Sequence, residues 1–320
     1  MRLGTRGSAL ALAQAQRVAE RLGGAEIRTT AQLAAEAGWE AGAGEDGAAT
    51  GDKSRWVRHL ERALLEGAID LAVHSAKDLP GELPTGLALL GAPARGAAGD
   101  VLVGAAGLES LPAGARVGTS SLRREAQLSA AREDLAVVPL AGNVDTRLRK
   151  LSEGAERLDA VVLAGAGLDR LGLDPRPRAS LDPARFVPAP GQGVIALEGR
   201  AGDEPARAAA AEISDAGTVA CLAAERSLAR ALEASCNTPI GAHATLPGAA
   251  GEAGSGSAST GLRLRAWIGL PDGSAWIGDE LAGAGIAEAE QLGIAVAERM
   301  RAAGAGDMLR EAEGMVLERA

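Results

Sequence analysis

One short unit, seen in Ala115–Arg124 (ARVGTSSLRR), decides the fold of this chain. A short apolar run leads into a loop of small residues, and a helical stretch that carries arginine follows. The unit recurs from Arg2–Gly4, from Leu135–Leu140 and from Asp159–Ala164. Each apolar run is short and continuous, which is typical of strands buried on both faces of a parallel sheet. The sequence therefore predicts an α/β, doubly wound architecture.

A fifth strand is expected at Ile69–Val73, after an amphipathic helix near Val57–Glu66. It leads into the loop His74–Pro80, where the proline ends any regular continuation. Ligands of open parallel sheets bind beyond the carboxyl ends of the strands. We therefore expect the five loops to line one site.

The last third of the chain changes character. A helix is expected at Val219–Leu232, a hairpin from Leu262–Gly269 and Ser274–Ile277, and a helix near Ala287–Ala303. These elements predict a small α+β domain. Two glycine-rich stretches, 38–51 and 247–261, are predicted to be mobile loops.

Composition narrows the class of ligand. The chain has 320 residues, a net charge of −9 and only 2% aromatic residues, with no tyrosine. Few aromatics disfavour base-stacking modules, and an acidic balance disfavours nucleic acid and anionic membranes as partners. The first residues lack an apolar signal region, and no apolar run is long enough to span a bilayer. We expect a cytoplasmic protein with a small-molecule substrate.

The two cysteines are too few for a disulfide framework, and no Cys/His spacing suggests a zinc site. Cys221 falls inside a predicted helix and is expected to act as a small buried hydrophobe. Cys236 falls in a loop, where a thiol is reactive if it is exposed and its thiolate is stabilised. His74 lies on an apolar strand, which favours a hydrogen-bonded core histidine.

Arginine recurs at the ends of the loops. Arg123 and Arg124 begin a predicted helix, where free backbone N–H groups and the helix dipole favour anions. Arg6 and Arg147 follow similar loops. In an acidic protein, this clustering predicts a site for a molecule with several carboxylates or phosphates. An ordinary capped and solvated helix start explains any one of these motifs equally well.

Asp78 is the one carboxylate expected at a strand end among the cationic loops. That position suits a catalytic acid or base, or a counter-ion for a cationic intermediate. Taken alone, a turn-forming or capping aspartate is the commoner case. Lys77 fits a surface charge as well as a ligand, whereas for Arg149, which lies further along its helix, a surface charge is the commoner case.

Six stretches of the chain resemble motifs of the porphobilinogen deaminase family. They are Thr5–Leu12, Ala72–Pro80, Val117–Arg124, Gly142–Leu148, Pro190–Gly193 and Cys236–Gly241. The motifs follow the order and approximate spacing of the family. The resemblance implies three domains, 1–94 with 193–213, 95–192, and 216–320, of which the first two are similar to periplasmic binding proteins.

The resemblance also implies an enzyme that converts porphobilinogen to linear hydroxymethylbilane with release of ammonia, and we expect it to be a monomer. A dipyrromethane cofactor would be joined to Cys236 by a thioether, and Asp78 would assist deamination. The implied cofactor ligands are Arg123, Arg124, Lys77, Ser121 and Ser8. The implied substrate ligands are Arg6, Arg147, Arg170 and Lys53.

The chain departs from the family pattern at three places. Ala141 stands where arginine is usual, and the segments Thr29–Gln32 and Gly51–Trp56 differ from the usual sequences. These departures bear on substrate capture. Two alternatives stay open at this point: an anion-binding protein without chemistry, and a weakly active member of the family.

Overall fold

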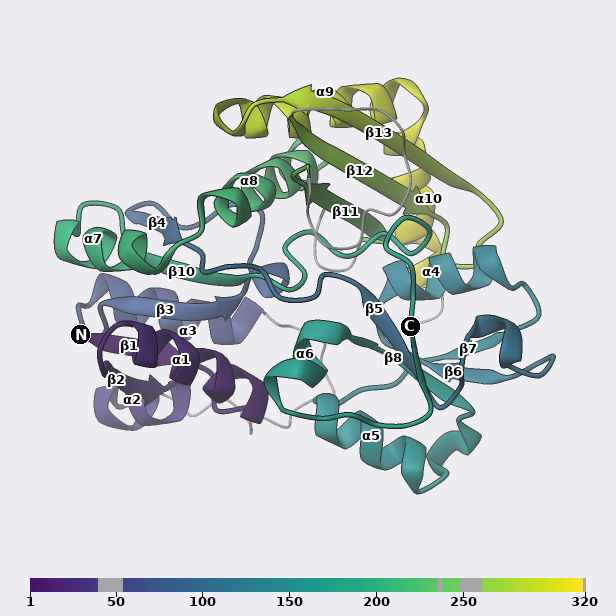
Figure 1. Cartoon of the computed structure of the whole chain (residues 1–320), viewed down its shortest axis with the longest axis horizontal. Helices are drawn as coiled ribbons and strands as arrows, with labels where there is room; N and C mark the ends of the chain where they lie inside the picture. The colour runs from purple at the N-terminus through teal and green to yellow at the C-terminus, as the bar shows by residue number, and fades with distance from the viewer. Residues whose placement is uncertain (40–53, 235–237, 248–260, 319–320) are drawn as a thin grey trace.

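The computed structural model describes residues 1–39, 54–234, 238–247 and 261–318, and these form three units, each built on a sheet (Figure 1). The strand orders are β2-β1-β3-β10-β4, β7-β6-β8-β5-β9 and β11-β12-β13. The prediction of an α/β chain with two doubly wound sheets and a small C-terminal α+β unit is confirmed. No helix in these ranges has the length and apolar character to cross a membrane.

The first unit contains the N-terminus and the strand that returns from the second unit. Its strands are β1 (Arg2–Thr5), β2 (Glu26–Thr29), β3 (Leu71–Ser75), β4 (Leu87–Gly91) and β10 (Ile195–Arg200). Its helices are α1 (Ala9–Arg21), α2 (Thr30–Ala37), α3 (Ser54–Leu65) and α7 (Glu204–Ile213). The predicted strands β1 and β3 are parallel neighbours. Their carboxyl ends therefore lie at one edge of the sheet.

The second unit repeats this plan. Its strands are β5 (Asp100–Val103), β6 (Arg116–Gly118), β7 (Ala136–Val138), β8 (Ala160–Ala164) and β9 (Arg178–Ser180). Its helices are α4 (Leu122–Ala131), α5 (Val144–Ser152) and α6 (Gly165–Arg170). The three predicted strands β6, β7 and β8 are parallel to one another.

Two strands run against the expected parallel order. β5 is antiparallel to β8, and β10 is antiparallel to β3. Each of them is the first strand after the chain crosses from one sheet to the other, through residues 92–99 or 187–194. A crossing chain enters the new sheet at the edge where the parallel strands of that sheet end, so its first strand runs in the reverse direction. The domain boundaries given above stay a prediction.

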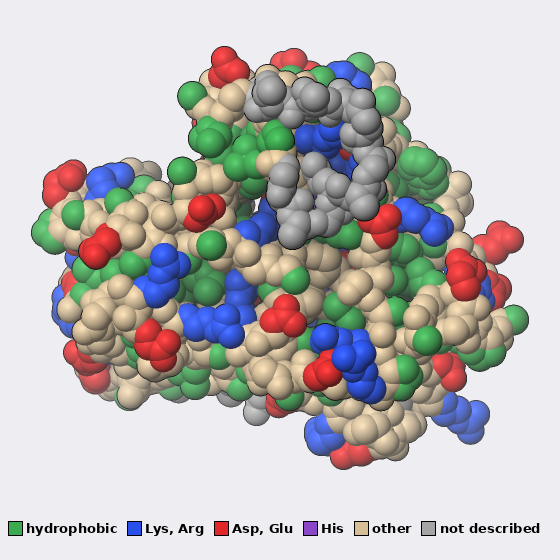
Figure 2. Space-filling view, in the orientation of Figure 1, with side chains coloured by type: hydrophobic (Ala, Val, Ile, Leu, Met, Phe, Trp, Pro, Cys, Tyr) green, Lys and Arg blue, Asp and Glu red, His purple; other side chains and the backbone are tan. Residues whose placement is uncertain are grey.

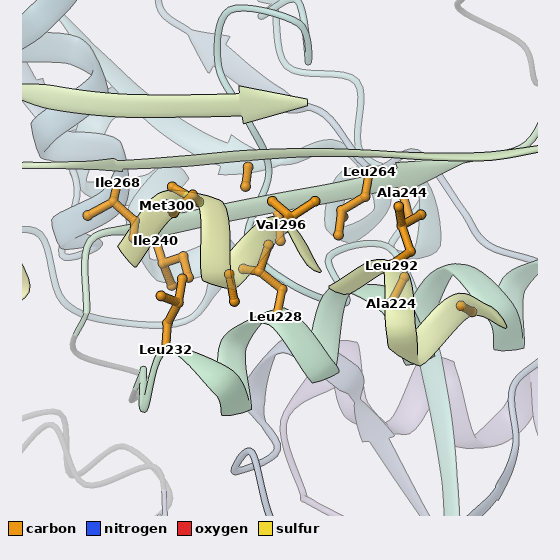
Figure 3. Packing of buried hydrophobic residues seen from close by; sticks show 14 of the residues in the cluster. Ala224, Leu228, Leu232, Ile240, Ala244, Leu264, Ile268, Leu292, Val296 and Met300 are labelled. Carbon is orange, nitrogen blue, oxygen red and sulfur yellow. The ribbon is translucent and has the colours of Figure 1, made fainter. Parts of the chain in front are cut away.

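The third unit packs helices against an antiparallel sheet. The strands are β11 (Ile240–Thr245), β12 (Leu262–Gly269) and β13 (Trp276–Ala284), and the helices are α8 (Ala216–Ala231), α9 (Ala289–Ala302) and α10 (Ala305–Leu317). Leu228, Leu264 and Val296 are fully buried where helix and sheet meet (Figure 3). The α+β prediction for this region is confirmed.

One boundary differs from expectation, and one helix is not indicated by the sequence. The second hairpin strand starts at Trp276 rather than Ser274, because Asp272 Oδ1 accepts a hydrogen bond from Ser274 N (3.0 Å) and holds it in the turn. The polar, alanine-rich segment after Gly202 contains α7, whose start is capped by Asp203. Ala206, Ala210 and Ile213 form its buried face.

Candidate active site

Arg6 and Asp78 meet at the edge of the first sheet. Arg6 follows β1, and Asp78 closes the short 3-10 turn η1 (Ala76–Asp78) after β3. Arg6 Nη1 lies 3.7 Å from Asp78 Oδ2, with about a quarter of each side chain exposed. This distance is a charge contact rather than a hydrogen bond. The carboxylate therefore stands beside a cation without being enclosed by it.

The backbone on both sides of Asp78 is held in place. Arg226 of α8 donates from Nη2 to the carbonyl oxygens of Pro80 and Gly81, at 2.8 Å each. On the other side, the backbone N–H of Ala76 donates to the carbonyl oxygen of Val194 at 3.0 Å. Fixed backbone reduces the reorganisation that a charged side chain needs during a reaction. Sequence reasoning did not find Arg226, which lies far along the chain.

Arg147 brings the second sheet to the same region. Its Nε donates to the carbonyl oxygen of Gly142 at 2.8 Å, and its side chain is largely buried. Burial, and then the positive charge of Arg124, lower the pKa of Arg147 to about 10, whereas Asp78 raises it. The charges of Asp78, at the edge of the first sheet, and Arg147, beside the second, therefore attract each other. A desolvated guanidinium of this kind favours an anionic ligand.

Arg123 and Arg124 have a different setting. Both are buried, with 3% and 6% of their surfaces exposed, and both bind Asp100 at the start of β5. Arg123 Nη2 lies 2.8 Å from Asp100 Oδ2, and Arg124 Nη2 lies 2.7 Å from Asp100 Oδ1. Burial alone would raise the pKa of Asp100, but the charges of Arg123 and Arg124 hold it below its usual range.

The remaining donors of this pair are also largely used. Arg124 donates from Nε to Asp100 and from Nη1 to the carbonyl oxygen of Val162, so each of its three nitrogens binds protein. Arg123 donates from Nη1 to the carbonyl oxygen of Val187. Its Nε is buried and has no partner in the described part of the chain. That these arginines anchor cofactor carboxylates stays a prediction.

Gln192 connects the two sheets. Its Oε1 accepts a hydrogen bond from Lys77 Nζ at 3.3 Å, and its Nε2 donates to Asp100 Oδ1 at 2.9 Å. Gln192 belongs to the motif Pro190–Gly193, but the sequence indicates no role for its side chain and does not single out Asp100. A single charge directly before the apolar run Val101–Val103 was the available signal, because charges are rarely buried without partners.

A buried ion pair fixes the third unit against the other two. Arg95 Nη1 lies 2.6 Å from Glu225 Oε1, and Glu225 is fully buried. The same carboxylate accepts hydrogen bonds from Gly191 N (2.6 Å) and Ala244 N (2.7 Å). α8 and β11 are thereby tied to both crossing segments. Nothing in the local sequence indicated this contact.

Cys236 and Lys53 lie outside the described residues. The strand that follows Cys236 is nevertheless placed, because Ala242 N donates to the carbonyl oxygen of Pro188 at 2.8 Å. Pro188 adjoins Val187, the acceptor of Arg123. Cys221 is buried, and burial raises the pKa of its thiol to about 12, so the expectation of an inert core cysteine is confirmed.

The other expected site residues are distributed more widely. Ser8 Oγ caps α1 by accepting from Ala11 N, and Ser121 precedes the first residue of α4. Arg170 ends α6 and donates from Nη2 to the carbonyl oxygen of Gly193 at 2.6 Å. The charges that act on it are Arg17 and Asp169 rather than Asp78. The described contacts therefore do not bring Arg170 to the carboxylate.

Two expectations of a structural role are confirmed. Arg149 is exposed and pairs with Glu153 at 3.0 Å, as a surface charge does. His74 is a core residue, with 6% of its surface exposed, but only the burial is confirmed, because its Nε2 lies 3.0 Å from Glu198 Oε2 without hydrogen-bond geometry.

Comparisons with known proteins agree across the whole chain. Residues 1–208 match the family model "Porphobilinogen deaminase, dipyromethane cofactor binding domain", and residues 219–302 match "Porphobilinogen deaminase, C-terminal domain". The porphobilinogen deaminase of Thermus thermophilus is 42% identical, over 97% of this chain and 98% of its own length. That of Rubrobacter xylanophilus is 41% identical, over 98% and 97%.

A likeness to solved structures is more distant. A nutrient binding protein from Burkholderia cenocepacia, bound to methionine, matches 66% of this chain and 90% of its own, with 12% identity and a TM-score of 0.38. The two family models and the relatives decide the assignment. This chain belongs to the porphobilinogen deaminase family.

Proposed function

We propose that the protein condenses four molecules of porphobilinogen with one of water to give linear hydroxymethylbilane and four molecules of ammonia. The observation that carries the proposal is a half-buried carboxylate, Asp78, which faces Arg6 from one sheet and Arg147 from the other. The family assignment supports a transferase. A cytoplasmic monomer without nucleic-acid or membrane partners is part of the proposal, and the net charge of −9 supports it.

The charges suit both ends of the substrate. Porphobilinogen carries acetate and propionate groups, which guanidinium groups such as those of Arg6 and Arg147 bind in a bidentate manner. The amino group of its aminomethyl side chain leaves as ammonia, so positive charge develops on the methylene carbon, which stays on the ring and then bonds to the next pyrrole. Asp78 would stabilise that charge, which is larger in the transition state than in the bound substrate.

The residues at the site fit the dipyrromethane cofactor that the family model names. Arg147 is a largely buried cation whose one hydrogen bond among the described residues goes to a neutral carbonyl, so carboxylates would stabilise it. Lys77, Arg123, Arg124, Ser8 and Ser121 would hold the cofactor, and Cys236 would carry it through a thioether. When bound, the cofactor supplies a covalent starting point for the chain of pyrroles.

Intact mass spectrometry tests both the function and the attachment. Protein from cells that make porphobilinogen should exceed the mass of the bare polypeptide by one dipyrromethane unit. Cys236→Ser should lose this addition and turnover together. Cys221→Ser is the matched control, because that thiol is buried within α8, and it should keep both.

Two results would contradict the proposal. An unmodified mass of the parent protein would show that no cofactor is attached. A Cys236→Ser variant that still carries the added mass would show that the cofactor is attached to another residue. Turnover is measured by the appearance of hydroxymethylbilane and the release of one ammonia for each porphobilinogen consumed.

A further inference from the structure

A pocket of about 390 Å³ lies between α1, α6 and the crossing segment at residues 93–96. The charged residues of its lining are Arg17, Glu20 and Arg21 from α1, with Asp169 and Arg170 from α6. Figure 2 shows basic side chains gathered on the face where α1 meets α6. Neither Asp78 nor Arg147 lines the pocket, and Arg170 is the one expected site residue among its lining residues.

The charge of this pocket is positive. Three guanidinium groups face two carboxylates, and within the described ranges none of the three forms an ion pair with a carboxylate. Glu20 is engaged by Gln16, whose Nε2 donates to it at 3.2 Å. Arg17 and Arg21 stand four residues apart on α1, so they project from the same side of the helix.

Arg170 is the inner cation of the pocket. It is partly buried, and its Nη2 donates to the neutral carbonyl oxygen of Gly193 at 2.6 Å. Burial, and then the charge of Arg17, lower the pKa of Arg170 to about 10, and Asp169 opposes them. An anion placed between Arg17 and Arg170 would offset both the burial and the repulsion.

The acceptor of Arg170 lies where the chain crosses between the sheets. The carbonyl oxygen of Gly193 accepts a second hydrogen bond from Gly96 N, at 3.0 Å, so it joins the two crossing segments. A Cβ atom at Gly96 would lie 3.4 Å from Arg170 Nη2, which shows how closely the first crossing segment packs on the guanidinium. The pocket is lined by both sheet units, through α1 of the first and α6 of the second.

We propose that this pocket binds a small polycarboxylate, with Arg17 and Arg21 at its rim and Arg170 at its base. Its volume lies within the usual range for small-molecule sites, roughly 300–1,000 Å³. Guanidinium groups match carboxylates in geometry as well as charge. The ligand has two possible sources, a free polycarboxylate or the far end of the growing pyrrole chain, and the second source rests on the proposed function.

Calorimetric titration with citrate tests the first source. Citrate should bind the whole protein in a one-to-one ratio, and Arg17→Gln with Arg21→Gln should weaken binding by at least about tenfold, because losing one charge-assisted hydrogen bond already has that effect. The matched control is Arg207→Gln with Arg310→Gln, which removes the same charge from exposed sites on α7 and α10. Thermal unfolding checks that both double variants are folded.

Intact mass spectrometry during turnover tests the second source. If the chain of pyrroles reaches the rim arginines, the Arg17→Gln, Arg21→Gln variant accumulates one chain length that the parent and the control do not. If the ligand is a free polycarboxylate, all three proteins show the same chain lengths and only citrate affinity differs. Either result supports the polycarboxylate pocket and identifies its occupant.

The proposal is overturned if the rim variant matches the parent in both experiments, or if the control loses citrate affinity equally. Failure of the proposed function gives a different result. A parent protein that forms no pyrrole chain at all contradicts that function, while the citrate titration still decides whether the pocket binds polycarboxylates.

Discussion

Two aspartates in this protein are each surrounded by arginine, and they differ in almost every other respect. Asp100 has 1% of its side chain exposed and binds Arg123 and Arg124 at 2.7–2.8 Å. Asp78 has 22% exposed and lies 3.7 Å from Arg6. The same residue types therefore form a buried, fully paired cluster at Asp100, whereas at Asp78 they leave a carboxylate that is partly exposed and only loosely paired. Distance and burial decide which of the two arises.

The largest expected effect is that of Asp100→Asn on stability. The substitution leaves two buried guanidinium groups without their counter-charge, and breaking a buried ion pair in this way costs about 3–5 kcal/mol. Urea unfolding of the two proteins measures the difference. Glu153→Gln, which removes an exposed partner of Arg149, is the control and should change stability little.

The pH dependence of that difference has a definite sign. The folded-state pKa of Asp100 lies below its usual value, so its ion pairs stabilise the fold fully above the unfolded pKa of about 3.9. The stabilisation is lost as the pH falls towards the folded-state value. The gap between parent and variant should be constant above about pH 5 and shrink below about pH 4. A gap that widens in acid would contradict this assignment.

Asp78→Asn should show the opposite pattern. Its ion pair is long and partly exposed, so stability and cofactor attachment should hardly change. Turnover should fall roughly a hundredfold or more, because an electrostatic group aimed at developing charge is lost. Steady-state assays of porphobilinogen consumption, with thermal unfolding of the same samples, measure both effects. Near-normal turnover would show that Asp78 is only a turn residue.

Sequence patterns identified the loops but not this division of roles. Arg124 and Arg147 both follow a parallel strand and a loop of small residues, so their local sequences predict similar anion sites. The difference comes from Asp100, which belongs to β5 and reaches Arg124 through the sheet. No local pattern contains a partner that is 24 residues away. The motif resemblance located Asp78, yet the buried pair Arg95–Glu225 also needed the structure.

The fold followed the same rule. Parallel strands such as β6 and β8 were predictable, because each has a continuous apolar run and a helix after it. The reversed strands β5 (DVLV) and β10 (IALEGR) also contain short apolar runs, and their direction depends on the crossing between sheets. Helix α7 was missed because its buried face consists mainly of alanine, which gives a weak periodic pattern.

The smallest predicted effect concerns Ala141, which lies in the loop that Arg147 contacts. Ala141 precedes Gly142, whose carbonyl oxygen accepts the hydrogen bond from Arg147 Nε. Ala141→Arg would place a second guanidinium beside the first. One hydrogen bond to a charged group contributes at least about 1.5 kcal/mol, so kcat/KM for porphobilinogen should rise about tenfold. Cofactor attachment should stay unchanged.

Arg149 is the nearest arginine that could compensate for the small side chain of Ala141, but its position on α5 excludes this role. Arg149 lies two residues beyond Arg147 on α5, but it is exposed and pairs with Glu153, so it does not replace an arginine at position 141. Steady-state kinetics at matched cofactor occupancy measure the effect, with Ala141→Gln as a control of similar length and no charge. The control should leave kcat/KM near the parent value. An unchanged or lower kcat/KM in Ala141→Arg would mean that the site binds its carboxylates fully with alanine in place.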